Sequence, residues 1–237
     1  MEKGYKNVVY LFLAITVIIL FGFYKTYFEL FPDFTGIKTI HHIHGLTLVL
    51  WLAMLIVQPI LINNKKYKLH RTIGKFSYVL VPLIFIFMLL VYKNQYLKGE
   101  ANGDPHVQNL GILFIPLTDT LPFVIFYILA IFNKKNISKH LRYMISTAII
   151  VVGPGLGRIF LIWLGMDFIT AITAVSVVLF FAFLGLILYD KIKGKQFKIN
   201  PFAISLLIFL IPNILILFVP NTSLWQTFAD GIVKTFF

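Results

Sequence analysis

No cysteine occurs in the 237-residue chain, and acidic residues are few. Without cysteine, the protein has no disulfide, no thiolate metal ligand and no cysteine nucleophile. Only 13% of the residues are charged, whereas 59% are hydrophobic. Soluble domains average about 25% charged residues, so this composition excludes an ordinary soluble protein. We therefore expect an integral membrane protein whose first partners are membrane lipids.

Long apolar stretches predict how many times the chain crosses the membrane. A helix needs roughly 20 apolar residues to span a bilayer. Seven stretches near this length occupy about residues 8–24, 43–63, 76–92, 107–132, 141–164, 168–190 and 201–219. Polar connectors rich in turn-forming residues separate these stretches. The expected fold class is all-α: one polytopic membrane domain over 1–237 with about seven transmembrane helices.

The lysines and arginines predict the orientation of these helices. With the N-terminus inside, fifteen basic residues fall on the inner side, five fall on the outer side, and Arg158 lies within a helix. The inner residues are Lys3, Lys6, Lys65, Lys66, Lys68, Arg71, Lys75, Lys134, Lys135, Lys139, Arg142, Lys191, Lys193, Lys195 and Lys198. The positive-inside rule then places the N-terminus in the cytoplasm and the C-terminus outside. The net charge of +12 is thus explained by topology, and we expect no nucleic-acid partner.

All six histidines lie near the ends of predicted helices. They are His41, His42 and His44 at the outer start of 43–63, His70 before 76–92, His106 at the outer start of 107–132, and His140 before 141–164. If the second to fifth helices form an antiparallel four-helix core, with the other helices flanking it, alternate helices face each other. His44 would then meet His106 near the outer surface.

The same packing would bring His70 to His140 near the inner surface. Imidazoles on facing helices are what a six-coordinate haem b needs, so the pattern predicts one or two haems. Arg71 and Arg142 stand beside the inner histidines and are candidates to bind haem propionates.

Four short segments carry a resemblance to a known family. They are HHIHG (41–45), LHRTIGK (69–75), DPHVQN (104–109) and KHLRYM (139–144). Their order and alternating sides resemble the cytochrome b561 type of membrane electron carrier over about residues 40–164. The resemblance implies a four-helix core with two haems b that passes electrons across the membrane, often from ascorbate. The HRxxG element at 70–74 is also similar to uncharacterised bacterial four-helix membrane proteins, so we expect a bacterial cytoplasmic membrane.

Two other functions remain open at this stage. His41 and His44 are helical neighbours, and Asp104 with His106 would complete four ligands for zinc or copper on the outer face. Such a site would be hydrolytic or would handle the metal itself. In the second alternative the protein is a non-catalytic receptor or scaffold, and the outer histidines are only interfacial residues. The electron donor, the acceptor and the assembly of copies into a homo-oligomer are not specified by these motifs.

Two charged residues fall inside predicted spans. Asp119 occurs in IPLTDTLP, and Arg158 follows GPGLG. Charges inside a membrane are functional candidates and are usually paired. We therefore consider an Asp119–Arg158 pair, either as a structural salt bridge or as a proton or substrate site. The GPGLG segment is expected to mark a kink or a close helix contact.

Overall fold

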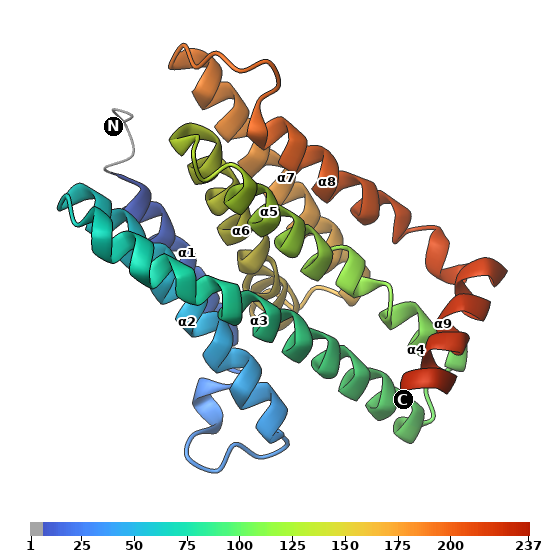
Figure 1. Ribbon diagram of the computed structural model, residues 1–237. Coiled ribbons are helices and arrows are strands. Elements are labelled where there is room, and N and C mark those ends of the chain that lie inside the picture. The colour runs from blue at the N-terminus through green and yellow to red at the C-terminus, as the bar shows by residue number, and fades with distance from the viewer. Residues whose placement is uncertain (1–6) are drawn as a thin grey trace.

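The computed structural model describes residues 7–237, and every regular element in that range is helical (Figure 1). The α-helices are α1 (Val8–Phe23), α2 (Thr39–Asn63), α3 (Tyr67–Asn102), α4 (His106–Ile112), α5 (Thr120–Phe132), α6 (Ile137–Arg158), α7 (Phe168–Ile192), α8 (Pro201–Leu215) and α9 (Ser223–Phe236). Shorter helical turns are η2 (Phe28–Leu30), η3 (Ile115–Leu117), η4 (Ile159–Trp163) and η5 (Val219–Asn221). Lys3 and Lys6, counted above on the inner side, lie outside the described residues.

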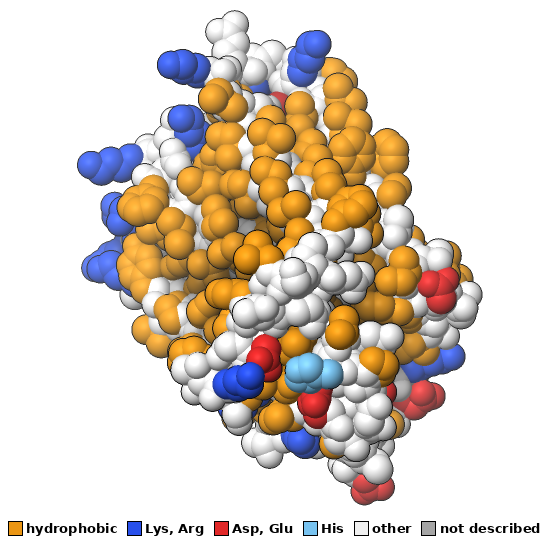
Figure 2. Space-filling model, turned by 90° about the vertical axis from the view of Figure 1, so that its right-hand side faces the viewer, with side chains coloured by type: hydrophobic (Ala, Val, Ile, Leu, Met, Phe, Trp, Pro, Cys, Tyr) orange, Lys and Arg blue, Asp and Glu red, His pale blue; other side chains and the backbone are white. Residues whose placement is uncertain are grey.

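The all-α membrane fold expected from the composition is confirmed. Six helical segments are long and apolar enough to cross a bilayer, and α1 is a shorter apolar helix. Many apolar side chains on these helices are exposed because their natural solvent is lipid. Figure 2 shows apolar side chains across the middle of one face, with basic side chains mainly along its upper and left margins.

The lysine-rich connectors gather at one end of the molecule. The α2–α3, α5–α6 and α7–α8 turns lie along the upper left side of Figure 1, on the same side as the start of α1. We call this end the basic end, and we call the other end, which carries the α1–α2 and α3–α4 turns, the opposite end. This arrangement is the one that the positive-inside rule requires of a polytopic protein.

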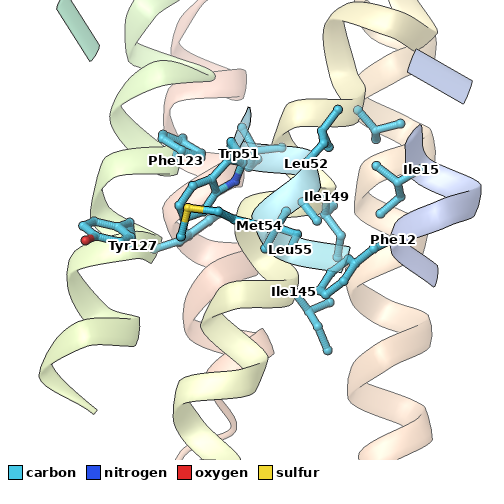
Figure 3. Packing of buried hydrophobic residues seen from close by; sticks show 14 of the residues in the cluster. Phe12, Ile15, Trp51, Leu52, Met54, Leu55, Phe123, Tyr127, Ile145 and Ile149 are labelled. Atoms are coloured by element: carbon cyan, nitrogen blue, oxygen red, sulfur yellow. The ribbon is translucent and has the colours of Figure 1, made fainter. Parts of the chain in front are cut away.

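The core is built from two helix pairs, α2 with α3 and α5 with α6. The first helix packs against both α6 and α2, so Phe12 and Ile15 belong to the main core rather than to its edge. Trp51 of α2 is fully buried and meets Phe123 and Tyr127 of α5 edge to face (Figure 3). The last two spans, α7 and α8, pack on α6 and add Leu179, Phe183, Phe202 and Phe209 to the same core.

The predicted span 107–132 is interrupted. It consists of α4, η3 and α5, and Asp119 caps the start of α5 instead of lying within a helix. The Asp119 carboxylate accepts hydrogen bonds from the backbone nitrogen and the hydroxyl of Thr120. Asp is a favoured N-cap because its oxygens satisfy amides that lack a partner in the first turn. The break therefore follows from the TDT sequence at 118–120.

The GPGLG segment makes the close helix contact expected of it. Gly22 of α1 lies directly against the backbone of Gly155 in α6, and a Cβ on Gly155 would come within 2.9 Å of the Ile19 Cα. Pro154 also lies within α6, and the helix changes to the π form immediately after Arg158. Two glycines thus let α1 approach α6 more closely than larger residues would.

The terminal helix α9 was not expected from the hydropathy. Thr222 caps it, Trp225 and Ala229 pack on α4, and the Trp225 indole donates to the Leu110 carbonyl at 3.0 Å. Its opposite stripe carries exposed Leu224 and Phe228. This helix mixes polar and apolar positions, so it lacks the unbroken apolar run by which the other helices are recognised.

Candidate functional site: a histidine pair at the basic end

His70 and His140 both lie at the basic end. Each belongs to the first turns of its helix, α3 for His70 and α6 for His140. The longer course of α3, which begins at Tyr67 and not near residue 76, places His70 inside a helix and fixes its position. The two inner histidines thus share one end of the bundle, and their meeting stays a prediction.

The His140 ring is held by a backbone group. Its Nδ1 lies 2.8 Å from the carbonyl oxygen of Ala130, at the end of α5. A carbonyl only accepts, so Nδ1 carries the proton and donates it. The neutral ring then presents a lone pair at Nε2. Histidines that bind metals commonly show this pattern, because a hydrogen bond at one nitrogen fixes the tautomer and aims the other.

The His70 ring is held by a side chain of a third helix. Gln58 of α2, only 9% exposed, lies with its amide against Nδ1 of His70 and against the backbone of Gly74. With the amide nitrogen toward His70, the amide oxygen accepts from the Gly74 backbone nitrogen at 3.1 Å. Gln58 was missed in the sequence, where the only signal was a lone amide inside the apolar run of α2.

The two arginines beside these histidines have different surroundings. Arg71 is exposed next to His70 and is free to meet an anionic group at the membrane surface. Arg142 is fully buried, and its Nε and Nη2 bind the two carboxylate oxygens of Asp190 in α7 at 2.7 and 2.6 Å. Arg142 is therefore committed to Asp190 and does not offer its guanidinium to a haem propionate.

The outer histidines occupy separate surroundings. His106 bonds Glu100 through Nδ1 at 3.0 Å and lies 3.8 Å from Asp230 of α9 through Nε2. His44 instead faces an internal cavity among the spans. No hydrogen bond or ion pair joins His44 to His106 within residues 7–237, so the expected outer pair stays a prediction.

The alternative metal site is not assembled either. Within the part of the chain that the structure describes, no three histidine, aspartate or glutamate side chains are grouped so that they could hold a metal ion. The proposed ligands His41, His44, Asp104 and His106 are therefore not a preformed set. His41 instead accepts from the Lys38 backbone nitrogen at 3.2 Å, which closes the first turn of α2. Its neighbour His42 lies 2.6 Å from the Tyr27 hydroxyl.

An internal cavity of about 60 Å³ lies toward the opposite end, where α1, α2, α3, α5 and α6 meet. Its lining is apolar apart from His44, Asp119 and Thr120. The Nδ1 atom of His44 is buried and makes no hydrogen bond within the described residues. A cavity of this size is large enough to hold water, which would satisfy His44 Nδ1.

The two intramembrane charges border this region without pairing. Tyr92 of α3 donates its hydroxyl to the Asp119 carboxylate at 2.6 Å. Arg158 stacks on Phe23, with its guanidinium carbon 3.9 Å from the ring centre, and donates to the Thr26 hydroxyl at 3.2 Å. No ion pair joins Asp119 to Arg158 in residues 7–237. The partner of the Asp119 carboxylate is therefore Tyr92 and not Arg158.

Comparison of the chain with protein-family models, characterised proteins and solved structures finds no match.

Proposed function

We propose that this protein is a haem b-binding electron carrier of a bacterial cytoplasmic membrane, with His70 and His140 as its two iron ligands. The observation that carries the proposal is that two helices each begin with an imidazole at the same end of the bundle, and that a neighbouring group lies against Nδ1 of each ring. A two-histidine haem site needs no third protein ligand.

The donor set suits this cofactor. The bond from His140 Nδ1 to the Ala130 carbonyl leaves Nε2 available to iron. The His70 ring is oriented by the Gln58 amide at Nδ1, and with the amide nitrogen there the ring must give up its Nε2 proton before it binds iron. A haem iron held by two imidazoles cycles between its ferric and ferrous forms by exchanging one electron, and it has no open position for oxygen.

Other residues at the basic end support such a site. Arg71 provides a positive charge beside His70 at the surface, where it would bind a propionate. Ser77, which is buried, donates to the Gly74 carbonyl at 2.6 Å and shares a hydrogen bond with the Tyr127 hydroxyl. Above this layer the aromatic core around Trp51 keeps water away. Because the basic end is expected in the cytoplasm, the electron donor or acceptor would be reached from that side.

The test is the absorption spectrum of the purified full-length protein before and after dithionite. We expect a Soret band that shifts on reduction, a sharp alpha band, and about one haem per chain. Elemental analysis of the same sample separates the alternatives. Stoichiometric zinc or copper without iron would instead support a metal enzyme or metal-handling protein. A colourless protein without metal would overturn the proposal and favour a receptor or scaffold.

A further inference from the structure

Helix α9 has two apolar stripes, and protein covers only one of them. Trp225 and Ala229 are buried in a cluster that α9 shares with α4. Leu224 and Phe228 are also one turn apart, but they are 80% and 58% exposed. Residues four apart lie on the same side of a helix, so these two side chains form a single apolar surface. We call Leu224 and Phe228 the exposed stripe.

The exposed stripe continues the apolar surface of α8. The last span ends at Asn221, only three residues before Leu224. Large apolar side chains are exposed all along the end of this span and the turn after it, at Leu207, Ile211, Ile214, Leu215, Leu217 and Phe218. Apolar side chains that are exposed on a span face lipid. The chain therefore enters α9 directly from a surface that faces lipid.

The level at which α9 meets α3 is the level of the membrane surface. Helix α3 has 36 residues, so it is about 54 Å long, whereas the hydrocarbon core of a bilayer is roughly 30 Å thick. Its long apolar run ends at Tyr92, and polar residues begin at Lys93. Trp225 shares its buried cluster with Tyr96 of α3. Lys93 donates to the Phe236 carbonyl at 2.7 Å. Helix α9 thus lies beside the first polar turns of α3.

The direction of α9 is that of a helix lying on this surface. In Figure 1 α9 runs across the direction of α8 and not along it. With 14 residues α9 is too short to span a bilayer. Figure 2 shows this side of the molecule, where charged side chains gather below the apolar band. A helix in the interface buries one apolar side at the boundary between head groups and acyl chains and keeps its polar side in water.

We propose that α9 is an interfacial helix whose Leu224 and Phe228 insert into the lipid leaflet at the opposite end of the molecule. Its partner is the apolar part of that leaflet and not an anionic head group. The only charged residues of α9 are Asp230 and Lys234, and they pair with each other at 2.6 Å. The helix therefore has no net charge that would attract anionic lipid. Through its buried stripe, α9 holds α4 and the end of α3 at the membrane surface.

Site-directed spin labelling tests the proposal, because the chain has no cysteine of its own. Leu224→Cys and Phe228→Cys each place a nitroxide on the exposed stripe. Lys234→Cys, at a side chain that is 74% exposed on the polar side, is the control. Exposed ion pairs contribute little to stability, so this variant keeps the fold.

The measurement is power saturation of the full-length protein in phosphatidylcholine nanodiscs. It compares collisions of the label with oxygen, which concentrates in lipid, and with a nickel chelate, which stays in water. We expect oxygen to collide more often than the chelate at positions 224 and 228, and the reverse at position 234. Adding phosphatidylglycerol should leave the ratios at 224 and 228 unchanged.

Three results would overturn the proposal, and none of them depends on haem. If the chelate collides more often than oxygen at 224 and 228 as well, the exposed stripe faces water. If neither reagent reaches these labels, protein covers the stripe, and spin–spin broadening between labels would identify that protein as a second copy of the chain. If oxygen exceeds the chelate only with phosphatidylglycerol present, anionic head groups recruit the helix.

Discussion

Arg142 of α6 and Asp190 of α7 form a two-bond ion pair from which solvent is almost entirely excluded. Asn200, which caps α8, donates to the same carboxylate at 3.0 Å, so three helices meet at one acidic group. The ring of Phe197 lies 4.6 Å from the Arg142 guanidinium carbon. An arginine that looked like a cofactor ligand in the sequence therefore joins α7 and α8 to the core.

Removing one member of this pair should destabilise the protein strongly. Asp190→Ala leaves the buried Arg142 guanidinium without its carboxylate, and such changes cost roughly 3–5 kcal/mol. We expect a clear fall in the thermal unfolding temperature in detergent. The double variant Arg142→Met with Asp190→Leu should lose less than Asp190→Ala, because it leaves no isolated charge. A double variant that is less stable than the single one would contradict this interpretation.

The contact between α1 and α6 should be sensitive to one added methyl group. Gly155→Ala places a Cβ within 2.9 Å of the Ile19 Cα, so the helices must separate, at a cost of roughly 1–3 kcal/mol. Gly157→Ala is the matched control, because its Cβ would lie 3.9 Å from Val175. Thermal unfolding of the two variants measures the difference. Equal unfolding temperatures would show that α1 is not held at this crossing.

Tyr92 should stabilise the break between η3 and α5. Tyr92→Phe removes the donor to the Asp119 carboxylate, and a hydrogen bond to a charged group contributes about 1.5–3 kcal/mol. We expect lower stability and faster hydrogen exchange at the start of α5. Tyr78→Phe, at an exposed position, should change neither quantity. The role of Tyr92 would be rejected if the two variants behaved alike.

The packing of α9 should depend on pH in the acidic range. Lys234 donates to Asp230 at 2.6 Å, and this bond holds the pKa of the Asp230 carboxyl below its ordinary value. A lowered folded-state pKa means that the bond stabilises the helix above the ordinary pKa of about 3.9. That stabilisation is lost as the pH falls through the lowered value. Hydrogen exchange in α9 should therefore accelerate on acidification, and Asp230→Asn should weaken this dependence.

The membrane fold was predictable because composition and hydropathy are properties of whole helices and not of single residues. The close crossing at Gly155 was also expected, since glycines in an apolar run serve few other purposes. The break at Asp119 was missed because the apolar residues continue on both sides of it. Helix α9 was missed because its apolar residues lie along one side of the helix and are not consecutive in the sequence.

The site was only partly predictable, for a physical reason. Helix order correctly placed His70 and His140 at the same end of the bundle, because each stands at the start of its helix. The order of the helices did not show which acidic residue Arg142 binds, because Asp190 is 48 residues away in the chain. It also did not show that His106 meets Glu100 and Asp230. Gln58 became visible as a partner of His70 only when the register of α2 against α3 was known.

The central claim is that His70 and His140 hold the iron, and electron paramagnetic resonance of the ferric protein tests it most directly. We expect a low-spin signal with two imidazole ligands in the wild type and in His106→Ala. In His70→Ala and in His140→Ala that signal should be replaced by a high-spin signal or be lost with the haem. A low-spin signal that survives both of these substitutions, or that disappears in His106→Ala, would contradict the assignment.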